Sequence, residues 1–357
     1  MPSSCSREAH PIELPAFLTH VGAPTQSNAS FDGARSLATV TPTQLRAFSA
    51  VVRLGSVKAA AAELGVTEAA VSLHVGHLRK ELEDQLFART GSGLAFTPGG
   101  LRLASRAGEM LGLQERTIRE VGQAGTGKRL MRVAASSLFA EHAAPGLIEL
   151  FVSRAADLDV ELSVHNTGEF ESLLTTRTVD VAIGPKPRQL PDSLLSKPFL
   201  NYQVVVVAGP RHPLAGVQAR PTQLREQIWL LGPSAAGDDT VVRGMLRRYD
   251  VPEENQRIFQ SHAAALEETT HNKGVSLALS FAVSDDIVNR RLVAISGPGV
   301  KGDGVWSTMT LPEHSLLPAA AELTRFISTP RATRAMLRGS GINIGHFRPS
   351  VYVTLWS

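Results

Sequence analysis

Apolar residues recur at helical spacing in two adjacent stretches near the start of the chain. Residues 56–64 read Ser-Val-Lys-Ala-Ala-Ala-Ala-Glu-Leu, and a serine before such a run is a typical N-cap. After a turn at Gly65 and Val66, a second helix is predicted from Thr67 to about Leu82. Its apolar residues step by four, three and four, so they share one buried face: Val71, Val75, Leu78 and Leu82. Two helices joined by a short glycine-containing turn are typical of a helix-turn-helix.

The opposite face of the second helix is small and polar. At 100° per residue it presents Ala69, Leu73, Gly76 and Lys80, with Glu68, Ser72 and His77 on its flanks. Small side chains let a helix enter the major groove of DNA. This pattern alone leaves open a helical hairpin inside an enzyme.

A short hairpin is predicted directly after the helix pair. Residues 86–90 and 94–96 flank the turn Gly91-Ser92-Gly93, where glycines supply the positive φ that a tight turn needs. A hairpin in this place is a wing beside a recognition helix, and it favours DNA binding over the enzyme.

From here the chain resembles the LysR-type transcriptional regulators, over residues 41 to about 339. The matching segments are Gln44-Leu45-Arg46-Ala47-Phe48, Gly55-Ser56, Ala59-Ala60, Leu64-Gly65-Val66-Thr67, Ala70-Val71-Ser72, Leu78, Glu81-Leu82 and Leu86-Phe87-Ala88-Arg89 through Thr97. The resemblance implies a winged helix-turn-helix in 41–97 that contacts double-stranded promoter DNA through Thr67, Glu68, Ala69, Ser72, Leu73, His77, Arg89 and Thr90. It also implies a homodimer or homotetramer, with RNA polymerase as a further partner. Two residues depart from the family pattern: Glu68 stands where Gln is usual, and Leu73 where Arg is common.

Residues 98–124 predict one long linker helix. Thr97-Pro98 is a helix start, and a repeat of three and four residues predicts a coiled-coil seam: Ala104, Ala107, Leu111, Gln114, Ile118 and Val121. In the family that the chain resembles, this helix pairs antiparallel with its twin, so the seam is expected to mediate dimerisation. The alternative is an amphipathic helix packed on its own domain. Residues 125–129 are expected to be a hinge, because the Gly-rich run 122–129 lacks the Ser or Thr after Lys128 that a phosphate-binding loop requires.

Strands and helices alternate in the rest of the chain, which predicts an α/β effector domain in 130–340. Its first subdomain is expected in about 130–208 and 305–340, with single helices over 139–154 and 316–337, and its second in about 209–304. Two such subdomains resemble the type II periplasmic binding proteins. The predicted fold is therefore a winged helix-turn-helix DNA-binding domain, a linker helix and a two-subdomain effector domain like a periplasmic binding protein.

Ligands in open α/β sheets bind beyond the carboxyl ends of strands. This rule selects the effector-binding candidates Ser136, Ser137, Asn166, Thr167, Pro233 and Ser234. Their hydroxyl and amide groups suit a small anion. The alternative is that these residues only cap helices.

Composition adds few constraints. The chain has 357 residues, 43% hydrophobic residues, a net charge of +3 and one cysteine, Cys5, so no intrachain disulfide forms and a reducing, cytoplasmic location is expected. The longest apolar run, 204–208, is far shorter than the roughly 20 residues of a membrane-spanning helix. Residues 1–40 and 341–357 are expected to be a flexible extension and a tail.

Three polar clusters are candidates for catalysis or metal binding: His74 with His77, Asp238-Asp239, and Glu267-Glu268. The histidines lack a third ligand nearby, and the acidic pairs read as residues at helix starts, so no catalytic residue, metal or cofactor is expected.

Two other functions remain open, a solute-binding transport component and a DNA-binding regulator without a small-molecule ligand.

Overall fold

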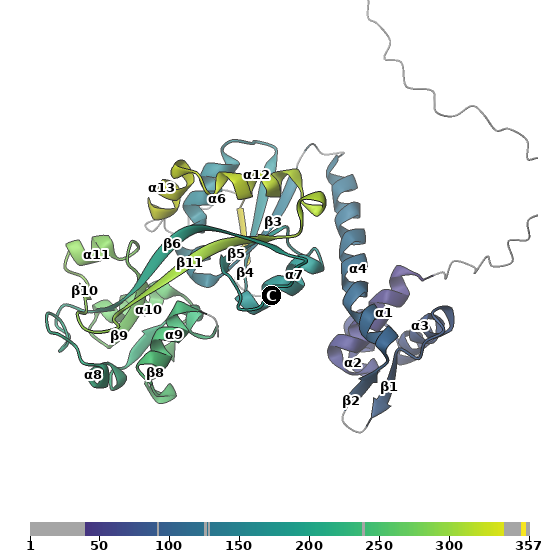
Figure 1. Cartoon of the computed structure of the whole chain (residues 1–357), viewed down its shortest axis with the longest axis horizontal. Coiled ribbons are helices and arrows are strands. Elements are labelled where there is room, and N and C mark those ends of the chain that lie inside the picture. The colour runs from purple at the N-terminus through teal and green to yellow at the C-terminus, as the bar shows by residue number, and fades with distance from the viewer. Residues whose placement is uncertain are drawn as a thin grey trace, which may run out of the picture.

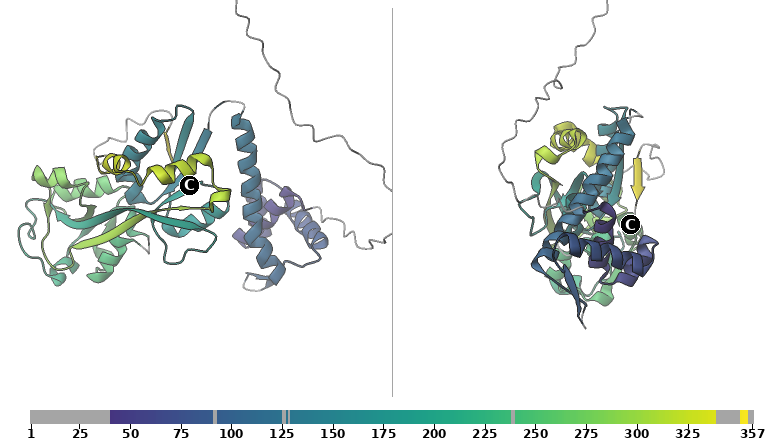
Figure 2. Two further views of the ribbon diagram at one scale, coloured as in Figure 1. Left: turned by 45° about the horizontal axis from the view of Figure 1, so that its top comes forward. Right: turned by 90° about the vertical axis from the view of Figure 1, so that its right-hand side faces the viewer.

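The computed structural model describes residues 40–90, 93–124, 127, 129–237, 240–338 and 351–354, with the backbone alone at 89–90, 93, 123–124 and 351–354. A small helical domain lies at one end, the long helix α4 follows it, and an α/β part lies beyond that helix (Figures 1 and 2).

Three helices form the core of the N-terminal domain: α1 (Pro42–Leu54), α2 (Val57–Leu64) and α3 (Glu68–Glu81). Each begins after a hydroxyl N-cap, because Thr41, Ser56 and Thr67 accept hydrogen bonds from the amides of the residues three positions later. Gly55 and Gly65 end α1 and α2 at φ 66°, a conformation that glycine adopts without strain. The predicted helix-turn-helix is confirmed.

The wing consists of strands β1 (Phe87–Thr90) and β2 (Gly93–Phe96), which pair antiparallel. Asp84 ties together the two ends of this hairpin, because it accepts hydrogen bonds at 2.6 Å from the Leu86 amide and the Thr97 hydroxyl. The hydrogen bond from Thr97, and then that from Leu86, lowers the pKa of the Asp84 carboxyl. The turn residues Gly91 and Ser92 lie outside the described residues.

The effector domain is built on a continuous sheet in the order β12-β4-β3-β5-β11-β6-β9-β7-β8, with β10 paired to β6. The strands of its first subdomain are β3 (Arg129–Ala135), β4 (Leu158–Val164), β5 (Val181–Pro185) and β12 (Val351–Thr354). Those of the second are β7 (Trp229–Leu231), β8 (Gln256–Ile258), β9 (Val275–Leu279) and β10 (Val293–Ala294). Two long strands, β6 (Leu195–Ala208) and β11 (Lys301–Thr310), pair with each other and cross between the subdomains (Figure 1).

Helices cover the sheet in both subdomains. The first subdomain carries α5 (Ser137–His142), α6 (Ala144–Val152), α7 (Phe170–Thr175), α12 (Pro318–Phe326) and α13 (Pro330–Arg338), with the short helices η1 (Thr167–Glu169) and η4 (Glu313–Ser315). The second carries α8 (Pro221–Arg225), α9 (Val241–Arg248), α10 (His262–Thr270) and α11 (Ser284–Val288), with η2 (Pro233–Ala235) and η3 (Glu253–Asn255). One large apolar core joins them, with Trp229 and Trp306 fully buried in it.

Prolines interrupt two helices that the sequence predicts as continuous. The helix expected over 139–154 is divided into α5 and α6, because Pro145 lacks an amide proton and its ring would clash with the carbonyl of Glu141 in a continuous helix. The helix expected over 316–337 is divided at Pro330, where the Thr329 hydroxyl caps α13 through the Ala332 amide at 3.3 Å. Glu267 and Glu268 lie in the second half of α10, not at a helix start. Asp238 and Asp239 lie outside the described residues.

Candidate DNA interface and effector cavity

The outward face of α3 is exposed along its length. Val71, Val75 and Leu78 are buried against α1 and α2, which turns the other side of the helix to solvent. That side holds Thr67, Glu68, Ala69, Ser72, Leu73, Gly76, His77 and Lys80, all exposed. Leu73 is 57% exposed, so one large apolar side chain lies within this otherwise small and polar face. The side chains of Arg89 and Thr90 lie outside the described residues.

The Arg79 side chain has a structural role, because it contacts the wing. Its guanidinium donates to the carbonyls of Gln85 (2.8 Å) and Phe87 (2.7 Å) and lies 4.8 Å over the Phe87 ring. These contacts tie α3 to the wing, so the helix and the hairpin present one rigid surface.

In the linker helix α4 (Pro98–Ala124), the first half of the predicted seam packs against the helix's own domain. Ala107 is fully buried in the core of the DNA-binding domain, and Ala104 and Leu111 pack against the same core. The first turns of α4 thus complete their own domain, with Ala107 buried there and Ala104 and Leu111 half-buried. Of the other seam residues, Gln114 is half-buried and its Oε1 has no hydrogen-bond partner in the described part of the chain, whereas Ile118 and Val121 are 62% and 70% exposed.

An exposed apolar stripe remains on α4. Met110 and Leu113 join Ile118 and Val121 in being exposed large apolar residues, and helical geometry places the four within about 140° of the helix circumference. The stripe, defined as these four residues, is the surface of α4 that a second chain could cover.

A cavity between the two subdomains contains five of the six effector-binding candidates. Its lining is Ser136, Ser137, Leu138, His165, Asn166, Thr167, Pro185, Tyr202, Ser234, Gly237, Thr240 and Trp306. Pro233 does not line it, because this residue opens η2 and only the following Ser234 reaches the cavity. The cavity volume of about 20 Å³ is enough for roughly one water molecule, so a larger ligand requires the subdomains to move apart.

Two residues that line the cavity have a buried polar atom without a hydrogen-bond partner among the described residues: Ser136 through Oγ and Trp306 through Nε1. The Ser136 side chain makes no capping hydrogen bond to α5, which disfavours a capping role for this residue. Buried polar atoms without partners are costly and rare in folded proteins. Both atoms are therefore suited to bind a ligand.

Aromatic rings hold these groups in place. Tyr202 stacks on Trp306 with ring centroids 4.5 Å apart, and Phe139 packs edge-on against Trp306 at 5.1 Å. Burial raises the pKa of the Tyr202 hydroxyl to about 12, so this group is neutral.

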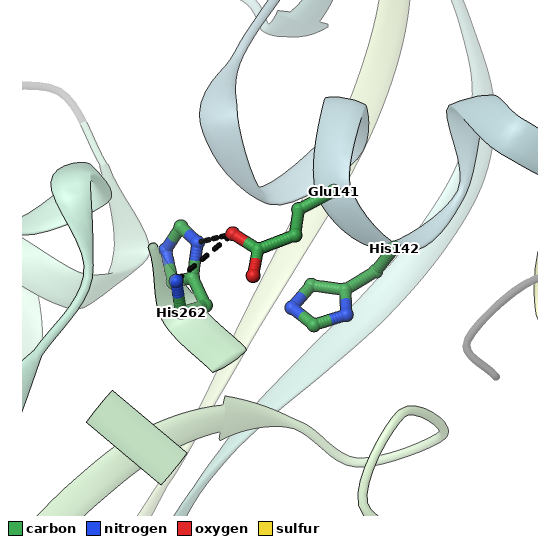
Figure 3. Close-up of side chains that lie close together, drawn as sticks. All are labelled: Glu141, His142 and His262. Atoms are coloured by element: carbon green, nitrogen blue, oxygen red, sulfur yellow. Dashed lines mark hydrogen bonds and ion pairs between the residues drawn. The ribbon is translucent and has the colours of Figure 1, made fainter. Parts of the chain in front are cut away.

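Ser234 begins a chain of hydrogen bonds that joins the subdomains. Its Oγ lies 2.9 Å from His262 Nε2, and His262 Nδ1 lies 2.8 Å from Glu141 Oε2 (Figure 3 shows the second contact). The Glu141 carboxylate also accepts from the amides of His262 (2.9 Å) and Ala263 (2.7 Å). This order of groups resembles the serine, histidine and carboxylate of a nucleophile relay. In this fold the chain connects the cavity wall to α5.

His142 lies beside this chain and titrates differently from Glu141. Burial, then the nearby His262, lowers the pKa of the His142 imidazole to about 4. Burial alone would raise the pKa of Glu141, but its hydrogen bond with His262 and the charge of that ring outweigh burial and lower it to about 2. At neutral pH the first group is therefore an uncharged imidazole and the second a carboxylate.

Comparison with known proteins identifies both parts of the chain. Residues 42–101 match the model of the bacterial regulatory helix-turn-helix protein, lysR family, and residues 124–329 match that of the LysR substrate binding domain. The chain belongs to the LysR family. It is a DNA-binding transcriptional regulator with an effector domain of the family's kind.

Individual relatives agree with the assignment of this LysR-family regulator. It is 57% identical, over 89% of its length and 100% of the relative's, to a Mycobacterium tuberculosis protein described as an uncharacterized HTH-type transcriptional regulator. It is 28% identical to the RuBisCO operon transcriptional regulator of Allochromatium vinosum, over 81% of this chain and 96% of that one. The crystal structure of full-length CbnR complexed with its target DNA has the same fold, with a TM-score of 0.50 and 19% identity over 84% of this chain and 99% of that one.

Sequence patterns miss several residues that the LysR-family fold brings to the cavity. Trp306 and Tyr202 come from the crossing strands β11 and β6, where their partners are set by strand pairing far along the chain. Glu141 and His262 are separated by 121 positions, so no local spacing could connect them.

Across the described residues, the regulator has no helix long and apolar enough to span a membrane.

Proposed function

We propose that this regulator binds operator DNA as a homo-oligomer through the exposed face of α3 and the wing. The contacting residues are those predicted on α3, Thr67, Glu68, Ala69, Ser72, Leu73 and His77, with Arg89 and Thr90 on the wing. The apolar stripe of α4 supports the oligomer, because four large apolar side chains on one helix face lose contact with water when a second chain covers them. We also propose that the regulator is located in the cytoplasm, where its DNA target lies.

We further propose that a small anionic molecule binds in the cavity and controls the regulator. One observation carries this proposal: Ser136 Oγ and Trp306 Nε1 are buried and unbonded in the same wall. The indole Nε1 can only donate, so the ligand must present an acceptor. A carboxylate offers several acceptor sites and makes the strongest hydrogen bonds with such donors.

Thermal unfolding of the full chain with a panel of small mono- and dicarboxylates tests this proposal. A carboxylate that binds the folded state raises the melting temperature by mass action. Trp306→Phe should weaken that binding by about 10- to 100-fold, the equivalent of one hydrogen bond to a charged group at roughly 1.5–3 kcal/mol.

Trp229→Phe is the matched control. Trp229 is equally buried, but its Nε1 donates to the Leu224 carbonyl at 2.9 Å outside the cavity, so this variant should lose stability and keep carboxylate affinity. The proposal fails if no carboxylate raises the melting temperature, or if both tryptophan variants keep wild-type affinity.

A further inference from the structure

A histidine-rich cluster lies where α5 of the first subdomain meets α10 of the second. Glu141 and His142 are the last residues of α5, and His262 is the first residue of α10. One ligand atom from each of the three lies within 4.8 Å of the other two. Figure 3 shows the Glu141 carboxylate reaching toward His262, with the His142 ring facing the same space.

His142 is the unexplained member of this cluster. The residue is 8% exposed, and neither ring nitrogen has a hydrogen bond among the described residues, although neither is completely buried. Its ring centroid lies 5.7 Å from that of His262. The imidazole therefore faces a carboxylate and a second imidazole with both nitrogens unused.

We propose that Glu141, His142 and His262 bind one divalent transition-metal ion of the zinc type between the two subdomains. One carboxylate and two imidazoles are a set of protein ligands found at zinc sites, whereas magnesium and calcium prefer oxygen ligands. Bonds of about 2.0–2.1 Å in a tetrahedral site separate ligand atoms by about 3.4 Å. Shifts of roughly 1 Å would bring the three ligand atoms from their present separations, 2.8 Å at the closest pair and up to 4.8 Å, to that value.

The contacts of His262 support this arrangement. An ion would take the place of the proton between His262 Nδ1 and Glu141 Oε2, which are 2.8 Å apart. The Nε2 nitrogen would then carry the remaining proton and donate it to Ser234 Oγ at 2.9 Å, the outer hydrogen bond that zinc-bound histidines typically make. Ser234 also lines the effector cavity, so the ion would fix the orientation of a cavity hydroxyl. A fourth position remains for water.

Zinc titration of the full, chelator-stripped chain against a coloured competitor chelator tests the proposal. We expect one zinc ion per chain, binding that is unaffected by excess magnesium, and a loss of affinity of at least about 100-fold in His142→Leu. This substitution should not harm the fold, because leucine is similar in volume and the imidazole has no hydrogen bond to lose among the described residues. Circular dichroism of the metal-free protein checks that point.

Two control variants keep the result specific. His77→Leu removes an exposed histidine of α3, where His74 and His77 form another pair, and Cys5→Ser removes the lone thiol; both should bind zinc like the wild type. Cobalt(II) should give the intense visible absorption of a tetrahedral site in the wild type and not in His142→Leu. The proposal is overturned if the wild type binds no zinc, if His142→Leu binds it equally well, or if either control variant loses it.

Discussion

Individual side chains in the effector cavity show how far local sequence rules reach. The rule that ligands bind beyond strand ends predicts five residues that line one cavity in the structure: Ser136, Ser137, Asn166, Thr167 and Ser234. The rule works for them because each follows a strand whose position is set locally. The same rule predicts Pro233, which does not line the cavity but precedes Ser234, which does. The donor of Trp306 could not be found in this way, since the pairing of β11 with β6 and β5 determines which side of a crossing strand faces the cavity.

Ser136→Ala should leave the free energy of unfolding unchanged or raise it when no ligand is present. The Ser136 hydroxyl is buried without a hydrogen-bond partner among the residues that the structure describes, so its removal relieves the cost of an unsatisfied polar group. Ser276→Ala is the matched comparison, because Ser276 is buried and its Oγ donates to the Leu230 carbonyl at 2.6 Å. That variant should lose about 1 kcal/mol. Urea denaturation measures both, and equal losses would mean that Ser136 is a structural residue.

Helices were predictable where caps and apolar periods agree, and less so where their ends depend on packing. The three helices of the DNA-binding domain begin at the predicted caps, whereas Pro145 and Pro330 interrupt two helices whose apolar periods continue across them. In α4 a single apolar period cannot show which part of the helix its own domain covers. Ala104, Ala107 and Leu111 pack in that domain, and Ile118 and Val121 do not.

Ile118→Glu combined with Val121→Glu should reduce the molecular mass measured by light scattering. Both side chains are exposed in the single chain, so the charges cost little there, but covering them in an interface costs several kcal/mol. Leu101→Glu is the control, because Leu101 is 59% exposed on α4 but lies outside the stripe. A double variant with wild-type mass would rule out the stripe as the contact between chains.

Gly112→Ala should disturb the contact between α4 and α7. A Cβ at this position would lie 1.6 Å from the Thr176 carbonyl oxygen, a backbone atom that cannot turn away, so the helix and the effector domain must separate. We expect a loss of roughly 1–3 kcal/mol in urea denaturation. Gly122→Ala, on the same helix and with nothing within 4 Å, should gain up to about 1 kcal/mol from helix propensity. Equal behaviour of the two alanine variants would contradict the close packing at Gly112.

At the scale of the whole molecule, a DNA-binding surface and a ligand cavity are linked by one helix. The order of these parts could be predicted from the sequence, since each has a local signature: caps and turns for the helix-turn-helix, a 27-residue helix, and alternating strands and helices. The Glu141–His262 contact between the subdomains could not, because it depends on how α5 and α10 meet in the finished fold. The overall mechanism requires that sequence-specific DNA binding reside on α3 and that two copies act together.

Selection from a random pool of DNA, with the wild type and Leu73→Arg in parallel, tests this central claim most directly. Leu73 is exposed at the centre of the α3 face and can offer only apolar contact, for which the thymine methyl group is the natural partner, whereas arginine prefers guanine. The wild type should enrich two related half-sites, as an oligomer requires, with thymine at the position that Leu73 contacts. Leu73→Arg should enrich a different half-site with guanine there. Identical half-sites for the two proteins, or no enriched sequence for the wild type, would contradict the account.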